Sequence, residues 1–407
     1  MWRKNDLVRK FYAFKITNTS GFYLPIYFAF LQDKGYELAF LGLLSAAFSF
    51  ALVAVEIPTG YLGDLLGRRG SLAVGAVVRA IVVGSYPFAG SKTAYVALHV
   101  LWAAGWAFRS GTQDAWLYEV LQSTCDEDEY ARIDGARGEQ EAAGASAVAA
   151  VLGGLMYTVE PAAPFLVNAA IALAALPILY SFPAIATDAD GDTFGVRDAI
   201  ALLRTQARRP EVRWFVAYAA VFATAFSATR PFEQPMLRAV GVPVAGLGFL
   251  YAGFKLVSSA AASSAGVVED HLGVRGAFAV LPAVYGLAFG LVFAVPIAVV
   301  PVVFLNRAVN TVVRPIRNKY LNDHLDDVGR ATVLSGASMA LSVTAGLGKV
   351  VNGHVTDAVG AVDGVATASV VLAGVGALLW FAVDPVRGRG GTDPTPESSI
   401  EDATPSD

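Results

Sequence analysis

Charged residues are scarce in this chain of 407 residues: they make up 16% of it, whereas hydrophobic residues make up 55%. A soluble domain usually carries about 25% charged residues. The apolar residues also come in runs that are too long for a globular core, such as GFYLPIYFAFL and SAAFSFALVAVEIPTGYL. A helix needs roughly 20 mostly apolar residues to cross a bilayer. The shortage of charge therefore argues against a large soluble enzyme and predicts an all-α membrane protein.

Cysteine is nearly absent as well. The single residue, Cys125, excludes an internal disulfide, and its acidic neighbours do not form a metal-binding pattern. The sequence has no glycine loop of the kind that binds phosphate, no zinc-ligand spacing and no nucleophile constellation. We therefore expect no metal, no cofactor, no nucleic-acid partner and no enzymatic activity.

Twelve apolar segments are long enough to be membrane spans. They lie near 11–31, 37–63, 71–90, 93–121, 139–159, 162–182, 212–236, 244–268, 276–293, 297–318, 331–353 and 361–383. The first begins after a charged stretch, exceeds the length of a signal-peptide core and lacks a small-residue cleavage pattern. It is therefore interpreted as a span that the mature protein keeps.

The distribution of basic residues supports both the count and the orientation. If the N-terminus is cytoplasmic, twenty Lys and Arg residues lie in inner segments, and only Lys34, Lys92 and Arg238 lie in outer loops. Cytoplasmic loops of membrane proteins carry such an excess. Omitting one span would destroy the alternation. We predict that both termini are cytoplasmic.

The longest inner connection divides the chain. Residues 1–182 form a first six-helix bundle, 183–211 a cytoplasmic linker, and 212–383 a second six-helix bundle. Within the linker, RDAIALLRTQARR is either a helix at the membrane surface or a solvated charged helix. Residues 384–407 are rich in Pro, Gly, Ser and acid, and this composition predicts a disordered cytoplasmic tail.

One short motif occurs twice. GYLGDLLGRR contains Gly60, Asp64, Gly67, Arg68 and Arg69, and GVVEDHLGVR contains Gly266, Asp270, Gly273 and Arg275, 206 residues later. A second pair of landmarks, Arg109 with Arg132 and Arg307 with Arg330, recurs at an offset of 198. Each motif lies between the second and third spans of its half. These matches indicate an internal duplication, and parallel repeats of this kind are typical of transporters.

The repeated turn has a physical role that needs no catalysis. A glycine at position 67 can adopt the left-handed conformation that a short reversal requires. The arginines hold the loop on the cytoplasmic side. Asp64 can bind the positive end of a neighbouring helix, in a contact that forms when the inner mouth closes. The alternative is a plain anchored loop.

The pattern G-x-L-G/A-D-x-x-G-R-R/K between spans two and three resembles the signature of the major facilitator superfamily. EIPTGYLGDLLGRR, FRSGTQDAWLYEVL and RATVLS look like its efflux-type prokaryotic branch. The resemblance implies two six-helix bundles that rock around a central cavity. It also implies that Asp64 meets the start of span eleven near Ala331 in the outward-facing state, and that Asp270 meets the start of span five. Span five lacks the proline of the drug–proton antiporter motif, a departure from that branch.

Several charges fall within the spans, where each costs about 2.5–3.5 kcal/mol at the bilayer centre. Such residues usually mark pathways or pairs. Glu56, Arg79 and Asp114 lie at one depth, so they can form an ion-pair cluster or a proton relay. Arg230 and Glu233 are three residues apart and can pair on one helix face near the outer surface.

Arg109, Lys255 and Arg307 lie near the midplane without acids at the same depth. In the superfamily, spans four and ten line the cavity. We therefore expect Arg109 and Arg307 to face each other and to bind an anionic group, since the guanidinium fork matches carboxylate or phosphate. The alternative is that local polar groups neutralise each arginine. Asn18 in span one is a further candidate cavity residue.

These features together predict a monomeric secondary transporter of the plasma membrane, which would export a small molecule by alternating access. Protons are a candidate coupling ion. The first alternative is a carrier for uptake or exchange of organic anions, which the midplane arginines favour. The second is a transport-inactive receptor or assembly partner on the same scaffold.

Overall fold

The structure, a computed structural model, describes residues 4–110, 112–113, 116, 118, 120, 138–182, 210–325 and 330–386. No strand occurs in these ranges. The helices of the N-terminal half are α1 (Lys4–Thr17), α2 (Tyr27–Asp33), α3 (Leu38–Ser85), η1 (Tyr86–Phe88), α4 (Lys92–Ser110), α7 (Gly138–Val159) and α8 (Ala163–Tyr180). Those of the C-terminal half are α10 (Pro210–Thr229), η3 (Arg230–Phe232), α11 (Glu233–Ala239), α12 (Val244–Ala294), η4 (Pro296–Ala298), α13 (Val299–His324), α14 (Arg330–Val359) and α15 (Ala361–Val383).

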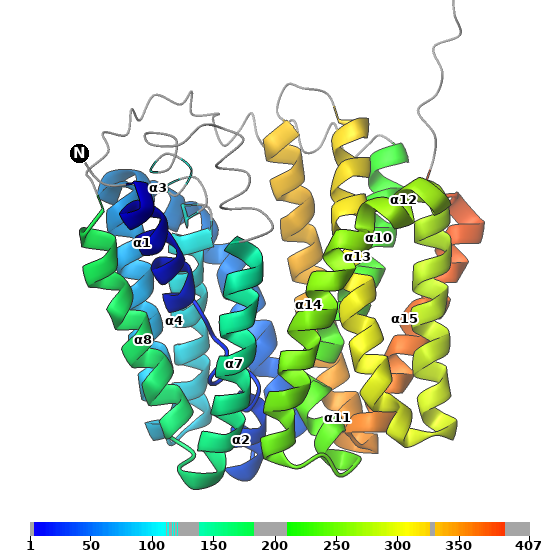
Figure 1. Ribbon diagram of the computed structural model, residues 1–407. Coiled ribbons are helices and arrows are strands. Elements are labelled where there is room, and N and C mark those ends of the chain that lie inside the picture. The colour runs from blue at the N-terminus through cyan, green and yellow to red at the C-terminus, as the bar shows by residue number, and fades with distance from the viewer. Residues whose placement is uncertain are drawn as a thin grey trace, which may run out of the picture.

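The helices form two bundles that stand side by side (Figure 1). Nine helices in the described part of the chain are long and apolar enough to cross a membrane. One of these nine is α12, which bends at Gly273 and so supplies two spans. With the broken α1–α2 segment and α4, the described ranges contain the twelve expected segments, six in each bundle. The expected fold class is confirmed. Most of the predicted linker (183–211) and tail (384–407) lies outside the described residues.

A single left-handed glycine makes each repeated turn. Gly67 inside α3 has φ +69°, and Gly273 inside α12 has φ +63°. Side chains with a Cβ rarely adopt such backbone angles. The expected conformation of Gly67 is confirmed. Helical structure nevertheless continues on both sides of the glycine, where the span boundaries predicted a loop over 64–70.

The duplication is visible at the opposite ends of these helices. Helices α2 and α11 have seven residues each and begin 206 residues apart. Gly35 (φ +82°) and Gly241 (φ +91°) follow them at the same offset. Two landmarks define directions along the bundle: the Gly67 end, where Gly273 also lies, and the Gly35 end, where α2 and α11 meet.

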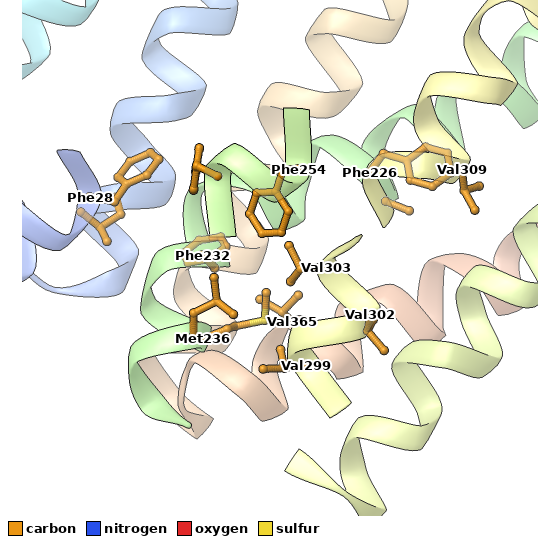
Figure 2. Packing of buried hydrophobic residues seen from close by; sticks show 14 of the residues in the cluster. Phe28, Phe226, Phe232, Met236, Phe254, Val299, Val302, Val303, Val309 and Val365 are labelled. Atoms are coloured by element: carbon orange, nitrogen blue, oxygen red, sulfur yellow. The ribbon is translucent and has the colours of Figure 1, made fainter. Parts of the chain in front are cut away.

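The two halves are packed together at the Gly35 end. One buried apolar cluster contains Phe28 of α2 as well as Phe232 and Met236 of the C-terminal half (Figure 2). Glycines bring helix backbones into contact across the same seam: Gly42 meets Gly353, and Gly154 meets Gly248. Toward the Gly67 end, a cavity of about 800 Å³ lies between α3 and α4 on one side and α13 and α14 on the other.

Candidate functional site

The first and seventh spans are both broken halfway. The first is helical to Thr17 and again from Tyr27, and the seventh passes through the 3-10 turn η3 between α10 and α11. Pro25 and Pro231 lie at these breaks, 206 residues apart. Proline cannot donate the helical hydrogen bond and clashes with the preceding turn. Broken helices at corresponding positions of two repeats are the usual place of a transporter's binding site.

Side chains from neighbouring helices donate hydrogen bonds to polar groups at both breaks. Arg79, which is 5% exposed, donates to the carbonyl of Thr17 at the end of α1. In the other half, Asn352 donates to the carbonyl of Ala228 at 2.9 Å, and Asn306 donates to Thr229 Oγ1 at 3.0 Å. A cation at a helix C-terminus also stabilises the helix dipole. Arg79 therefore has a structural role at the break of span one.

A central cavity of about 330 Å³ lies between the halves, beside both breaks. Three cationic side chains line it: Arg230 of η3, Arg307 of α13 and Lys349 of α14. Its aromatic lining residues are Tyr27, Phe28, Phe48, Trp102, Trp106 and Tyr251. None of the described residues around this cavity is acidic. The cavity is thus electropositive and well suited to an anion.

Arg307 is held in place before any ligand binds. It forms an ion pair with Glu233, whose side chain is 0% exposed, and its guanidinium lies 5.5 Å from the ring of Tyr251 and 5.2 Å from that of Phe254. Arg230 and Glu233 do not form the expected ion pair in the described ranges, although Glu233 still acts on Arg230 electrostatically. Glu233 is turned toward Arg307 in the buried interior.

Arg230 shares the acid Glu233 with Arg307 and has no ion pair of its own in the described ranges. Lys349 donates to Ser49 Oγ of the opposite half at 2.8 Å. Arg230 makes no hydrogen bond or ion pair with any residue in the described ranges, and its side chain is exposed beside the cavities that it lines. Its side chain opens both into the central cavity and into a smaller cavity of about 150 Å³ within the C-terminal half.

The structure does not bring Arg109 and Arg307 together around one cavity. Arg109 donates to Asn18 Oδ1 at 3.1 Å, and Asn18 donates to Gln113 Oε1 at 3.1 Å. The Arg109 guanidinium lies 4.9 Å from the ring of Trp106 and braces it. Neither Arg109, Asn18 nor Lys255 of α12 is among the described residues that line the central cavity.

Of the predicted network of Glu56, Arg79 and Asp114, only Glu56 and Arg79 lie in the described ranges, and these two do not pair. Glu56 lines the wide cavity at the Gly67 end, together with Gly60 and Arg68 of the turn motif. Within the described part of the chain, Arg79 bonds to the Thr17 carbonyl and not to Glu56. Asp114 lies outside the described residues.

The motif arginines bind the last helix of each half. Arg69 donates to the carbonyls of Leu179, at 3.0 and 2.7 Å, and of Phe182, at 3.0 Å. Arg275, its repeat partner, forms an ion pair with Asp384 at 3.0 Å. The side chain of Asp64 lies outside the described part, and Asp270 is exposed. The expected gating contacts of the two acids remain predictions.

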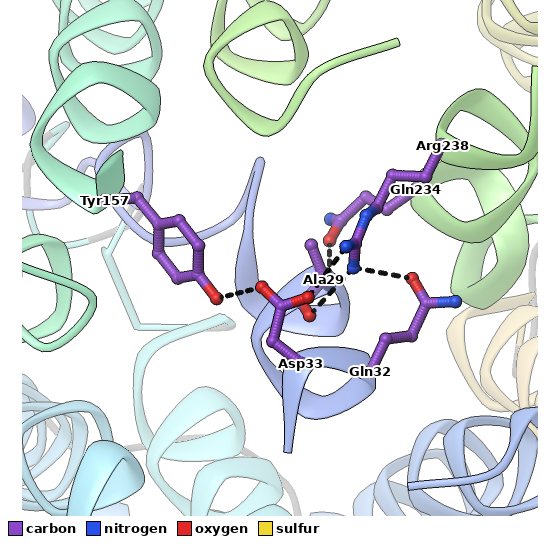
Figure 3. Close-up of polar contacts among 6 residues, drawn as sticks. All are labelled: Ala29, Gln32, Asp33, Tyr157, Gln234 and Arg238. Carbon is purple, nitrogen blue, oxygen red and sulfur yellow. Dashed lines mark hydrogen bonds and ion pairs between the residues drawn. The ribbon is translucent and has the colours of Figure 1, made fainter. Parts of the chain in front are cut away.

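Polar contacts of Gln234 and Arg238 with the N-terminal half form a clasp at the Gly35 end (Figure 3). The sequence did not predict it. Gln234 Oε1 accepts hydrogen bonds from the backbone N–H groups of Phe28 and Ala29, both at 2.9 Å. Arg238 pairs with Asp33 at 2.7 Å, and Tyr157 donates to the same carboxylate at 2.7 Å. From the sequence, Arg238 is only one of the three basic residues in the predicted outer loops. One sequence feature could have indicated these contacts: an apolar span that ends in three polar residues, Glu233, Gln234 and Arg238.

Known proteins give independent comparisons. Residues 11–232 match the sequence model of the Major Facilitator Superfamily. An uncharacterized MFS-type transporter of Bacillus subtilis (strain 168), YxaM, is 22% identical over 251 residues, which are 60% of this chain and 61% of that protein. The crystal structure of the nucleoside transporter NupG superposes with a TM-score of 0.77 at 13% identity, covering 95% of this chain and 99% of that one.

A second solved structure is a bacterial homolog of the human lysosomal transporter Spinster, in an inward-facing and unoccupied conformation. It superposes with a TM-score of 0.69 at 14% identity and covers 94% of this chain and 96% of that one. At these identities the structural likeness establishes the fold alone.

Proposed function

Because the chain belongs to the major facilitator superfamily, we propose that it is a secondary transporter which moves a small anion across the plasma membrane by alternating access. The superfamily consists of membrane transporters, and the fold described above is theirs. The substrate, the direction and the driving ion are parts of the proposal.

Arg230 carries the proposal. A cation within a membrane protein normally faces a partner or a pathway, because its burial in the bilayer is costly. Arg230 lies at the break of span seven and borders a cavity that Arg307 and Lys349 also line. Glu233 forms its ion pair with Arg307 and none with Arg230, so the three cations that line the cavity share this one acid. An anionic substrate would supply the missing charge.

The shape of the molecule is consistent with one state of an alternating-access cycle. The Gly35 end is closed by the seam glycines and by the clasp of Gln234 and Arg238, and the wide cavity lies toward the Gly67 end. The excess of basic residues favours a cytoplasmic Gly67 end. In that orientation the cavity opens inward. The efflux-type motifs of the sequence favour export as the direction.

Counterflow in proteoliposomes tests the proposal. The anions tested are a panel of carboxylates and phosphate esters. Vesicles loaded with the unlabelled form of a transported anion should accumulate its radiolabelled form from the medium. Arg230→Gln should abolish this accumulation. Lys319→Gln should retain it, since Lys319 pairs with Glu269 away from the central cavity. Accumulation of neutral or cationic solutes alone, or full activity of Arg230→Gln, would contradict the proposal.

The direction requires a second measurement. Vesicles in which the Gly67 end faces outward should take up the substrate when a proton gradient is imposed if the protein is a proton-coupled exporter. Uptake only into vesicles of the opposite orientation would indicate an importer.

A further inference from the structure

The central cavity is chemically divided between the two halves. Its three cations, Arg230, Arg307 and Lys349, all belong to the C-terminal half. Five of its six aromatic rings belong to the N-terminal half: Tyr27, Phe28, Phe48, Trp102 and Trp106. A ligand that spans this cavity therefore meets a cationic wall on one side and an aromatic wall on the other.

The rings of the N-terminal half are held by contacts among themselves, which are centred on Trp102. The Trp102 ring lies 5.3 Å from that of Phe48, 5.9 Å from those of Tyr23 and Tyr27, and 5.7 Å from that of His99. Because these rings brace one another, they form a preorganised surface. Such a surface costs little side-chain entropy when a flat ligand packs against it.

Trp106 offers the most accessible ring of this wall. Its side chain is 42% exposed and lines the central cavity, and the guanidinium of Arg109 lies over it at 4.9 Å. Arg109 thus fixes the indole without occupying the cavity. An aromatic ligand can stack on such a ring in offset or edge-to-face geometry.

The sixth ring does not alter this division. Tyr251 belongs to the C-terminal half, but Arg307 lies over it at 5.5 Å and Gln234 donates to its hydroxyl at 3.2 Å. Tyr251 therefore orients Arg307 within the cationic wall. The cavity, at about 330 Å³, is at the lower end of the range for ligand pockets, so the ligand is small.

From this division we infer that the transported anion is a small aromatic carboxylate. Its ring lies against Trp106 and Trp102, and its carboxylate lies on Arg230, with Arg307 and Lys349 close by. This inference rests on the proposed transport function and specifies its substrate. The two walls belong to bundles that separate in an alternating-access cycle, so a ligand of this kind contacts both bundles at once.

Three probes of similar size separate the contribution of aromatic stacking from that of the negative charge. They are benzoate, its saturated counterpart cyclohexanecarboxylate, and its neutral counterpart benzamide. Calorimetry on the detergent-purified full chain should give a dissociation constant for benzoate about threefold to tenfold below that for cyclohexanecarboxylate, because only benzoate stacks. Benzamide should bind about tenfold to a hundredfold more weakly than benzoate, because it lacks the charge-assisted hydrogen bonds.

Variants assign each preference to its wall. Trp106→Leu should abolish the preference for benzoate over cyclohexanecarboxylate and keep the preference for carboxylate over amide. Arg230→Gln should keep the preference for benzoate over cyclohexanecarboxylate and abolish the preference for carboxylate over amide. Phe48→Leu provides a second test of the aromatic wall if Trp106→Leu does not fold. Trp214→Leu, on α10 and outside the cavity lining, should keep both preferences.

The outcomes separate this inference from the function on which it rests. Equal binding of benzoate and cyclohexanecarboxylate, with counterflow of aliphatic anions intact, would overturn the aromatic assignment and leave anion transport standing. Counterflow of no anion at all would overturn the proposed function itself. Loss of both preferences in Trp106→Leu alone would also overturn the assignment of separate walls.

Discussion

Arg69 and Arg275, 206 residues apart, each tie the start of the third helix of their half to the end of the sixth. Arg69 donates to the carbonyls of Leu179 and Phe182, and its guanidinium lies 5.0 Å from the ring of Tyr180. Arg275 contacts Asp384 and the carbonyl of Val386, and lies 5.7 Å from the ring of Trp380. The repeated turn motif therefore closes each bundle on itself.

The two contacts should differ in strength. Arg69→Gln removes three hydrogen bonds from a cation to backbone carbonyls in a partly buried site, and should lower the stability by about 2 kcal/mol. Arg275→Gln should cost less than about 1 kcal/mol, because Arg275 and Asp384 are 60% and 49% exposed. Thermal unfolding of the purified protein in detergent measures both. A larger effect of Arg275→Gln would contradict this ranking.

The buried pair of Glu233 and Arg307 should show strong energetic coupling. Glu233→Gln leaves Arg307 without its counter-charge, and removal of one partner of a buried ion pair costs about 3–5 kcal/mol. The double variant Glu233→Gln/Arg307→Gln should recover much of that loss, since no unpaired charge remains. A double-mutant cycle on thermal stability measures the coupling. Additive effects of the two substitutions would show that the pair does not stabilise the fold.

Much of the architecture follows from the sequence because it depends on local chemistry and on composition. The apolar runs predict the spans, and the offset of 206 between the two GxxxD turns predicts equivalent elements in the two halves. Gly67 has a left-handed backbone because the turn geometry requires a residue without a Cβ. Each of these inferences needs only short segments of sequence, compared with one another or taken alone, and no knowledge of which helices pack together.

The polar partners of the site could not be predicted in this way. A spacing of three lets Arg230 and Glu233 share a helix face, but it does not decide which cation the buried carboxylate contacts. That choice depends on which helices pack around the break. The pairing of Glu233 with Arg307, 74 residues later, therefore follows from tertiary structure.

A larger side chain in place of a glycine at the seam between the halves should open the Gly35 end. A Cβ at Gly154 would lie 2.9 Å from the carbonyl oxygen of Ala245 and 3.1 Å from Cα of Gly248, so Gly154→Leu cannot pack in the closed arrangement. Gly144 lies on the same helix with no atom within 4 Å of its Cβ position, so Gly144→Leu is the matched control.

Spin labels at Glu160 and Asp363, in a Cys125→Ser background, report this opening. Both sites are exposed, and they lie on different halves at the Gly35 end. Gly154→Leu should lengthen the distance between the labels, and Gly144→Leu should leave it unchanged. An unchanged distance in both variants would show that the seam tolerates bulk.

Gln234 should stabilise the same closed end through hydrogen bonds. In Gln234→Ala the N–H groups of Phe28 and Ala29 have no acceptor while the Gly35 end is closed. Each unsatisfied donor costs about 1–3 kcal/mol, so the closed state is destabilised relative to the open state. The open population should therefore rise more than about tenfold. Gln32→Ala, which loses one hydrogen bond of 3.4 Å, should change it little. The same spin-label pair measures the populations, and equal populations in the two variants would contradict the assignment.

Arg314 should act on the approach of the anion, since it lines both the wide cavity at the Gly67 end and the small cavity that Arg230 also lines. Arg314→Gln should raise the KM for the transported anion about threefold to tenfold and leave the maximal rate nearly unchanged, because it removes electrostatic attraction along the entry route.

Ionic strength separates this role from a role in folding. The Debye length is about 8 Å at 0.15 M salt and shorter above it, so added salt should raise the KM of the unmodified protein and have a smaller effect on Arg314→Gln. Lys319→Gln removes a charge from the same helix outside these cavities and should keep the original salt dependence. Because Arg314 connects the wide cavity to Arg230, identical salt dependence in all three proteins would mean that the anion reaches Arg230 by another route.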